Sequence, residues 1–265
     1  MPDPRIPVTI AGAAGRMGRA LTGLLSDHPR LCLGACLMRP GHPWLSAPPA
    51  DLDGALITAD AAAALQATRA VIDFTLPQAA APIATAASAA GAVHVLGTSG
   101  FAEADIARLE QAGRGAVTIR SGNMSLGVNL LAVLAQQVAA ALDADFDIEI
   151  GEIHHRNKID APSGTAMMLG EAAAAGRGVR LSQVALRGRD GHHGVRPRGA
   201  IGFSSLRGGD VVGEHDVWFA GPGERLILRH VATDRTIYAR GALKAAEWGL
   251  SQPPGQYSML DVLGL

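Results

Sequence analysis

The amino-acid sequence predicts an α/β protein with two regions, the first built on a doubly wound parallel sheet. Three observations lead to this prediction. Short apolar runs alternate with helix-like segments through the first half of the chain, and these runs are rich in Val, Ile and Leu throughout. After Asn123 the rhythm changes, and later strands follow one another without helices. Continuous apolar strands are buried on both faces, and their alternation with helices indicates parallel pairing.

The first half supplies strands and helices in alternation. Strands are expected at Ile6–Ala11, Leu31–Met38, Ala70–Phe74, Ala92–Leu96 and Ala116–Arg120. Helices are expected at Arg16–Ser26, Ala61–Thr68, Pro77–Ala90 and Glu103–Ala112. This order is typical of repeated strand–helix–strand units that place helices on both faces of one sheet.

The second half has a different organisation. A longer helix is expected at Leu126–Leu142, a strand at Phe146–Ile153 and a helix at Ala166–Ala175. From about Ala200 to Val231 we expect three strands joined by turns at RGGD and GPGE, which form a second, mostly antiparallel or mixed sheet. A final helix is expected at Gly241–Leu250.

Composition and charge exclude several classes of protein. Hydrophobic residues make up 48% and charged residues 18% of the 265 residues, which favours a packed core over disorder. A net charge of -1 argues against a nucleic-acid or membrane-surface binder. Cys32 and Cys36 share one predicted strand, which places them about 13 Å apart, too far for a disulfide. With neither a signal peptide nor a membrane span in view, we expect a cytoplasmic protein.

A glycine-rich loop, IAGAAGRMGR, follows the first predicted strand and opens the first helix. Glycines at 12, 15 and 18 allow a tight turn and a close approach of the backbone to a pyrophosphate, which the free N–H groups of the helix start would then face. We therefore expect a Rossmann-like nucleotide site, formed by Gly12, Ala13, Ala14, Gly15, Arg16 and Met17. The spacing is a variant of the usual fingerprint, and a turn that binds nothing is the alternative.

The end of the second strand indicates which dinucleotide is bound. A carboxylate at this place would accept hydrogen bonds from the adenosine ribose of NAD, but this chain has Met38 followed by Arg39. A methionine accepts such bonds poorly, whereas an arginine can pair with a 2′-phosphate. We therefore expect NADPH to be preferred, with NADH possible. The alternative for Arg39 is a solvated surface side chain.

The segment EIHHRNKIDAPSGTA combines proton donors, a cation and a helix start. His154 shares one face of the predicted strand with Glu152 at its C-terminal edge, while His155 points the other way and is poorly placed to share a metal ion. Lys158 follows in a short loop, and Ser163 is a natural N-cap for a helix from about Gly164. A cation and a positive helix end form a site for a carboxylate or phosphate, and His154 could transfer a proton there.

These residues also carry a resemblance to a known family. EIGEIHHRNKIDAPSGTA is similar to the signature of the dihydrodipicolinate reductases of bacterial lysine and diaminopimelate synthesis. The similarity extends through nearly the whole chain, including VIDFT, LGTSGF, NMSLGVN and GAIGFSSLRGGDVVGEH. It implies a nucleotide domain of residues 1–125 and 235–265 and a substrate domain of residues 126–234, whose open mixed sheet assembles a homotetramer.

The resemblance further implies NAD(P)H-dependent reduction of 4-hydroxy-tetrahydrodipicolinate, a small dicarboxylate, with loss of water and without a metal. By similarity His154 is the proton donor and Lys158 a second catalytic cation, and substrate contacts are made by His155, Gly164 and Thr165. The family's cofactor contacts fall in two further loops, at Gly97, Thr98 and Ser99, and at Ser121, Gly122, Asn123 and Met124.

Two positions depart from the family pattern. Many members have an acidic residue where Met38 stands, and a phenylalanine is common where Met124 stands. A flexible thioether can fill the space of the lost ring. His192 and His193 are expected in a surface or interface loop, with a lid as the alternative, and His215 is expected on a strand of the second sheet. The rival functions are another two-domain NAD(P)-dependent dehydrogenase and a non-catalytic nucleotide sensor.

Overall fold

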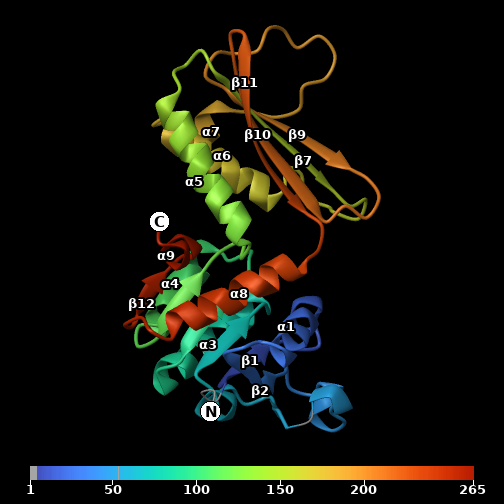
Figure 1. Ribbon diagram of the computed structural model, residues 1–265, viewed down its shortest axis with the longest axis vertical. Helices are drawn as coiled ribbons and strands as arrows, with labels where there is room; N and C mark the ends of the chain where they lie inside the picture. The colour runs from blue at the N-terminus through green and yellow to red at the C-terminus, as the bar shows by residue number, and fades with distance from the viewer. Residues whose placement is uncertain (1–4, 53) are drawn as a thin grey trace. The chain divides into compact units, whose positions relative to one another are not determined.

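The structure, a computed structural model, describes residues 5–52 and 54–265 and divides into two compact units (Figure 1). The first unit contains the described residues up to Leu126 together with Arg235–Leu265, and the second is Gly127–Asp234. Each unit has its own sheet and its own hydrophobic core. The chain therefore leaves the first unit near Leu126 and returns to it at Arg235.

The first unit is built on a seven-stranded sheet in which every neighbouring pair is parallel. The strand order is β12-β6-β5-β4-β1-β2-β3. The strands are β1 (Ile6–Ala11), β2 (Leu31–Leu37), β3 (Leu56–Thr58), β4 (Ala70–Asp73), β5 (Val93–Leu96), β6 (Val117–Arg120) and β12 (Gly255–Tyr257). Because β1 lies between β2 and β4, the loop after β1 is where the strand order reverses, the usual place for a ligand in such sheets.

Helices cover this sheet. The helix α1 packs against α8, and α8 also contacts β4, β5 and β6, while α3 packs between α2 and α4 and contacts β4 and β5. The helices are α1 (Arg16–Ser26), α2 (Ala61–Gln66), α3 (Pro77–Ala90), α4 (Glu103–Ala112), α8 (Thr236–Gly249) and α9 (Met259–Leu263), with short 3-10 turns η1 (Pro43–Leu45) and η2 (Ala50–Leu52). The doubly wound parallel sheet predicted from the sequence is confirmed.

Three details of the first unit differ from the sequence prediction. The edge strands β3 and β12 were not expected, because each is only three residues long. The helix expected at Gly241–Leu250 is α8, which begins at Thr236, and it is not the final helix because α9 follows it. Gly241 lies inside α8, where a Cβ atom would stand 1.7 Å from the backbone oxygen of Met124. Glycine here permits close packing of the helix and does not mark its start.

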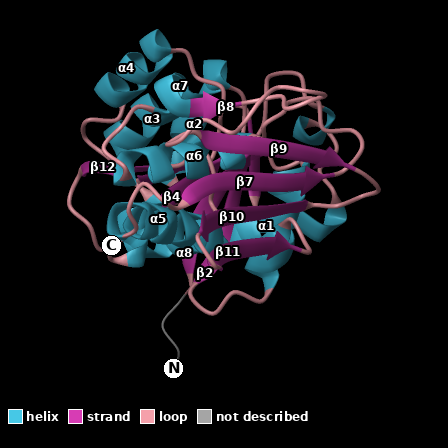
Figure 2. Ribbon diagram, turned by 90° about the horizontal axis from the view of Figure 1, so that it is seen from above, coloured by secondary structure: helices cyan, strands magenta, loops and turns pink. Residues whose placement is uncertain are grey.

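The second unit has a five-stranded mixed sheet in the order β11-β10-β7-β9-β8. β10 is antiparallel to β7 and β11, whereas β7, β9 and β8 are parallel. Figure 2 shows β9, β7, β10 and β11 side by side. The elements are α5 (Leu126–Ala141), β7 (Asp147–His154), α6 (Gly164–Gly176), α7 (Leu181–Val184), β8 (Ala185–Leu186), β9 (Ile201–Arg207), β10 (Gly213–Gly221) and β11 (Glu224–Ala232). The second mixed sheet is thereby confirmed.

The two faces of this second sheet differ. Apolar residues of α5 and α6 form one core with Ile148, Phe203 and Phe219 on the inner face. The outer face exposes Leu206 (63%), Trp218 (43%) and Ile227 (51%). Along β7 buried and half-buried residues alternate, so Glu152 and His154 lie on the inner face, as their spacing predicts.

Two remaining expectations concern the cysteines and the loop histidines. Both cysteines are free, but only Cys36 is buried, while Cys32 is half-buried. Burial and then the charge of Asp51 raise the pKa of Cys36 to about 11. His192 and His193 lie in an exposed segment between β8 and β9 that is neither helix nor strand. Within the described residues, no helix is both long and apolar enough to cross a membrane.

Candidate active site

The glycine loop after β1 has the geometry of an anion cradle. Gly12 adopts a left-handed conformation with φ of 71°, which glycine accepts without steric cost. Gly18 lets α1 approach the loop, because a Cβ there would stand 2.4 Å from the backbone oxygen of Gly12. Gly15 is the N-cap of α1, and no side chain among the described residues caps this helix end. Its first N–H groups are therefore available to a phosphate.

A pocket of about 700 Å³ adjoins this loop within the first unit. Its walls include Gly12, Gly15, Met38, Arg39 and Thr75. The side chain of Arg39 is exposed, whereas Met38 is 5% exposed and packs in the first core. The volume lies in the range of cofactor sites, roughly 300–1,000 Å³. The guanidinium of Arg39 at the rim can donate hydrogen bonds to a ligand. The residues present therefore fit the adenosine and pyrophosphate part of a dinucleotide.

The loops that follow β4 and β5 are tied together by a buried carboxylate that the sequence reasoning missed. Asp73 accepts hydrogen bonds from the backbone N–H and the hydroxyl of Thr75, at 2.8 and 2.6 Å, and from the hydroxyl of Thr98 at 3.4 Å. Nε2 of His94 lies 3.4 Å from its other oxygen. Burial opposes ionisation, but the bonds from His94 and Thr75 lower the pKa of Asp73. Gly97, Thr98 and Ser99 thus follow a strand end that Asp73 holds in place.

Two of the proposed cofactor residues have apolar side chains that are buried in the first core. Ala13 is fully buried and Met124 is 1% exposed, and both pack in the first core. Either residue can therefore reach a ligand only through its backbone. In the loop after β6 the hydroxyl of Ser121 donates to the backbone oxygen of Asn123 at 2.7 Å, which fixes the turn at Ser121 to Asn123.

In the second unit, His154 stands at the end of β7 against a buried glutamate. Nδ1 of His154 is 2.6 Å from Oε2 of Glu152, and the side chains are 10% and 1% exposed. Arg207 at the end of β9 donates to both oxygens of Glu152, at 2.7 and 2.8 Å. A Cβ at residue 213 would lie 2.9 Å from Nε2 of His154, so Gly213 keeps the space beside that nitrogen clear.

The loop between β7 and α6 brings a cation and a helix start to the same place. Nζ of Lys158 is 2.8 Å from Oδ1 of Asp160. The hydroxyl of Ser163 caps α6 by accepting from the N–H of Ala166 at 3.1 Å, which confirms the predicted N-cap. The N–H of Ser163 donates to Oε1 of Glu152 at 3.2 Å. Glu152 therefore ties the start of α6, with Gly164 and Thr165, to the end of β7.

His215 on β10 belongs to this cluster, which the sequence interpretation of a plain strand histidine did not include. Its Nε2 is 3.0 Å from the hydroxyl of Ser163, and its ring meets that of His154 edge to face at 5.0 Å. Burial, then the nearby charge of His154, lowers the pKa of His215 to about 4. His215 is thus neutral at neutral pH. His155 lies next to the cluster and is half-buried.

The charges of the cluster set the protonation of its members. Burial opposes ionisation of Glu152, but hydrogen bonds from Arg207, Ser205 and His154 lower its pKa to about 2. Burial lowers the pKa of His154, Glu152 counteracts this, and the charges of Lys158 and Arg207 lower it further. The net effect is that the pKa of His154 lies below the usual value of a histidine, and Glu152 is the group that opposes this shift.

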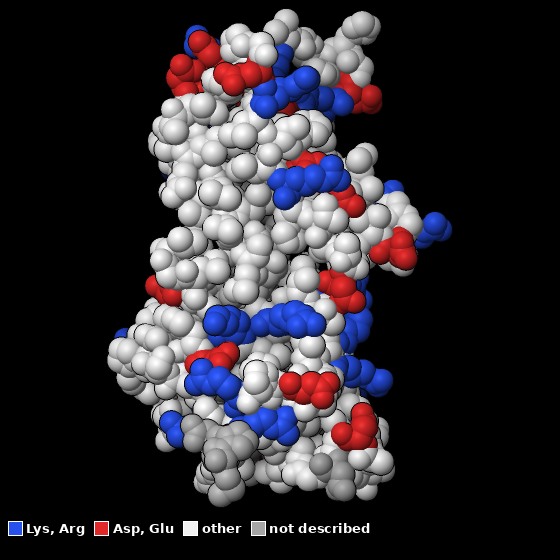
Figure 3. Space-filling view, viewed as in Figure 1, with Lys and Arg blue, Asp and Glu red and all other residues white. Residues whose placement is uncertain are grey.

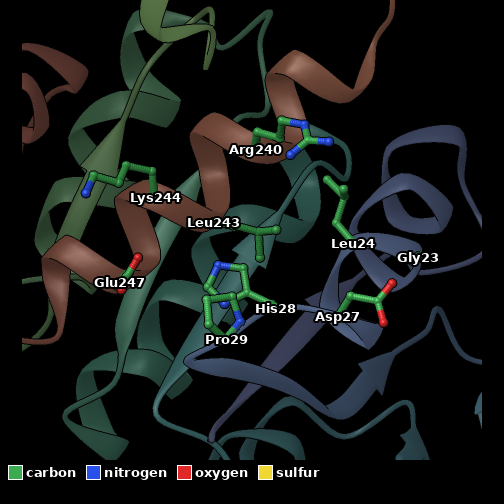
Figure 4. Close-up of a pocket in the computed structure, with 9 residues that line it drawn as sticks. All are labelled: Gly23, Leu24, Asp27, His28, Pro29, Arg240, Leu243, Lys244 and Glu247. Carbon is green, nitrogen blue, oxygen red and sulfur yellow. The ribbon is translucent and has the colours of Figure 1, made fainter.

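A further pocket of about 440 Å³ lies between α1 and α8 in the first unit. Figure 3 shows basic side chains in a row over α8, and Arg240 and Lys244 line this pocket. In Figure 4 the acidic Asp27 and Glu247 lie at opposite ends, with His28 between them. Glu247 is also 2.8 Å from Arg30. This mixed charge is typical of a solvated helix surface and does not match a ligand of one sign.

Together these features define a class of protein. A parallel sheet with a glycine loop and a nucleotide-sized pocket, combined with a second unit that holds a histidine against a buried glutamate, is typical of a two-domain dinucleotide-dependent oxidoreductase.

Comparison with known proteins identifies the family. The family model "Dihydrodipicolinate reductase, N-terminus" matches residues 6–124, and "Dihydrodipicolinate reductase, C-terminus" matches residues 127–263. The chain belongs to the dihydrodipicolinate reductase family, as its motifs imply, and is an oxidoreductase.

Individual relatives agree with this result. The chain is 56% identical to the 4-hydroxy-tetrahydrodipicolinate reductase of Ruegeria pomeroyi and 57% identical to that of Dinoroseobacter shibae, in each case over 97% of this chain and 98% of the relative. A solved dihydrodipicolinate reductase from Paenisporosarcina sp. TG-14, described as dipicolinate-bound, has the same fold. It superposes with a TM-score of 0.74 at 23% identity, over 97% of this chain and 99% of that chain.

Proposed function

We propose that the protein reduces 4-hydroxy-tetrahydrodipicolinate to tetrahydrodipicolinate with NAD(P)H and loss of water, in lysine and diaminopimelate synthesis. The reaction is inferred from membership of the family. The observation that carries the assignment of residues is the cluster of Glu152, His154 and Lys158 beside the start of α6. A cytoplasmic location belongs to the same proposal, because both cysteines are free thiols.

In this proposal the first unit binds the dinucleotide. The N–H groups at the start of α1 and the backbone of Gly12 to Met17 hold the pyrophosphate, and the pocket beside Arg39 takes the adenosine. The loops at Gly97–Ser99 and Ser121–Met124 hold the nicotinamide end, with Asp73 keeping the first of them in place. When bound, the reduced nicotinamide supplies the hydride.

The second unit binds the dicarboxylate in this proposal. Lys158 gives up its contact with Asp160 and pairs with one carboxylate, while the N–H groups near Gly164 and Thr165 and the ring of His155 take the other. The side chain of Asp160 is 53% exposed, so its ion pair with Lys158 is weak, about 0–1 kcal/mol, and is readily exchanged.

His154 supplies the proton. Hydride addition leaves an electron pair on the substrate ring, and protonation of that pair completes the reduction. Nε2 of His154 lies beside Gly213, where any larger residue would crowd it, whereas Nδ1 is occupied by Glu152. The proton therefore leaves from Nε2, and the neutral imidazole remains bonded to Glu152.

We also propose that NADPH is preferred to NADH. Arg39 lies exposed at the rim of the pocket and forms no ion pair with a carboxylate in the described part of the chain. It is therefore available to a 2′-phosphate. Met38, buried in the core, offers the ribose hydroxyls no strong acceptor.

A homotetramer completes the proposal. The outer face of the second sheet is an apolar groove of about 730 Å³ that includes Leu206 and Trp218 and is rimmed by charged residues such as Glu149 and Arg229. A second copy of the chain would bury these exposed side chains. Light scattering should give a tetramer for the wild type and smaller species for Trp218→Glu. Unchanged mass in that variant would place the interface elsewhere.

Mixing the purified protein with freshly made substrate and NADPH tests the reaction. Absorbance at the NADPH band should fall only when the substrate is present. Another dehydrogenase of this fold would leave NADPH unconsumed with this substrate, and a nucleotide sensor would bind NADPH without any turnover.

A further inference from the structure

We infer that Glu152 and Arg207 act together as positioning residues for His154: Glu152 holds the imidazole with Nε2 as its reacting nitrogen, and Arg207 keeps Glu152 ionised and in place. This inference rests on the proposed role of His154 as the proton donor. It assigns a function to the ion pair between the buried Glu152 and the half-buried Arg207.

The partners of Glu152 determine the tautomer of His154. Glu152 receives two hydrogen bonds from Arg207, at 2.7 and 2.8 Å, and one from the N–H of Ser163 at 3.2 Å. Such a carboxylate is ionised and can only accept. The contact of 2.6 Å with Nδ1 of His154 is therefore a bond that Nδ1 donates. The neutral ring then carries its hydrogen on Nδ1, and Nε2 is the nitrogen that gains and loses a proton.

The arrangement around Glu152 is held from several elements of the fold. Glu152 is held from three elements, since Arg207 comes from the end of β9, Ser163 from the start of α6, and His154 from its own strand β7. His154 and Arg207 are also paired in the register of β7 and β9. The side chain of Glu152 is 1% exposed, so water does not compete for its oxygens. The ring of His154 is thus fixed both at Nδ1 and against His215.

The charges of Glu152 and Arg207 act on His154 in opposite directions. Glu152 favours the protonated form of His154, whereas Arg207 and Lys158 disfavour it. Other titratable or charged groups surround His154. Glu152 comes from its own strand, and Lys158 with its partner Asp160 comes from the following loop. Arg207 and His215 come from the two neighbouring strands. Because Glu152 and Arg207 bear opposite charges, their removal must move the proton affinity of His154 in opposite directions.

The test compares the pH dependence of kcat/KM for Glu152→Gln and Arg207→Gln. The reaction needs protonated His154, so kcat/KM falls as the pH rises through its pKa. Glu152→Gln removes the group that raises this pKa. It should therefore move the alkaline limb of the pH profile of kcat/KM to lower pH, by about one unit or more. Arg207→Gln removes a group that lowers the pKa and should move the limb to higher pH. Glu171 lies exposed on α6, so Glu171→Gln removes the same charge as Glu152→Gln and should leave the alkaline limb in place.

A merely structural role would give a different result, because both variants would lose activity without opposite shifts of the limb. That outcome would overturn the inference. Either variant could fold poorly, so a second measurement uses the wild-type protein. With ¹⁵N-labelled histidine, NMR should show the neutral ring of His154, assigned by its loss in His154→Gln, protonated at Nδ1. Protonation at Nε2 would contradict the proposed geometry.

The same experiments separate this inference from the proposed function. If His154→Gln keeps wild-type turnover, His154 is not the donor and the proposed function fails, whatever the tautomer of the ring. If His154→Gln is inactive but neither Glu152→Gln nor Arg207→Gln moves the limb, only the role of the Glu152–Arg207 pair is wrong.

Discussion

Replacing Arg39 with alanine should reduce the affinity for NADPH far more than the affinity for NADH. The guanidinium lies at the rim of the nucleotide pocket, is exposed and has no carboxylate partner in the described residues. A hydrogen bond to a charged group is worth about 1.5–3 kcal/mol, and exposure favours the lower end of this range. The expected loss for NADPH is therefore roughly ten-fold, and the loss for NADH is small.

Fluorescence titration of both cofactors at low and high salt measures this effect. The NADPH advantage of the wild type should shrink as salt rises, because the contact is open to solvent. Arg39→Lys is the matched control and should keep part of the preference, since it retains the charge but not the planar fork. Equal losses for NADPH and NADH in Arg39→Ala would mean that Arg39 stacks on the adenine. Equal wild-type affinities at low salt would mean that no preference exists.

Two further changes test the second unit. Lys158→Met should raise the substrate KM and lower kcat while NADPH affinity stays constant in titration, because Lys158 lies outside the unit with the glycine loop; a loss confined to NADPH affinity would contradict its role. Ser163→Ala should lower Tm by at least roughly 2–4 °C, because it removes an N-cap bond worth about 1 kcal/mol and also the contact of the same hydroxyl with Nε2 of His215. Thr85→Ala, which removes an exposed bond within α3, should leave Tm unchanged in calorimetry.

Periodicity and glycine placement were sufficient to predict most of the fold. The strands β1, β2, β4, β5 and β6 lie within a residue or so of their predicted bounds, because each is a buried run of apolar side chains. The edge strands β3 and β12 could not be predicted this way, since a strand of three residues is defined by the neighbour it pairs with. The start of α8 was also missed, because a glycine in close packing resembles a helix boundary.

The candidate site was predictable only where its residues are close in sequence. Glu152, His154, Lys158 and Ser163 fall within one short segment, and strand alternation placed the first two on one face. Arg207 and His215 come from other strands, and only the pairing of β9 and β10 with β7 brings them to His154. The alternation of inward and outward side chains along β9 and β10 could have indicated that Arg207 and His215 point inward. It could not have indicated which residue they contact.

The most direct test of the account is the turnover of His154→Gln, measured together with its NADPH affinity and its Tm. We expect kcat to fall by a factor of about 10² to 10⁴, while NADPH binds as tightly as in the wild type and the protein remains folded. Near-normal kcat in a folded, NADPH-binding His154→Gln protein would show that the proton comes from another group.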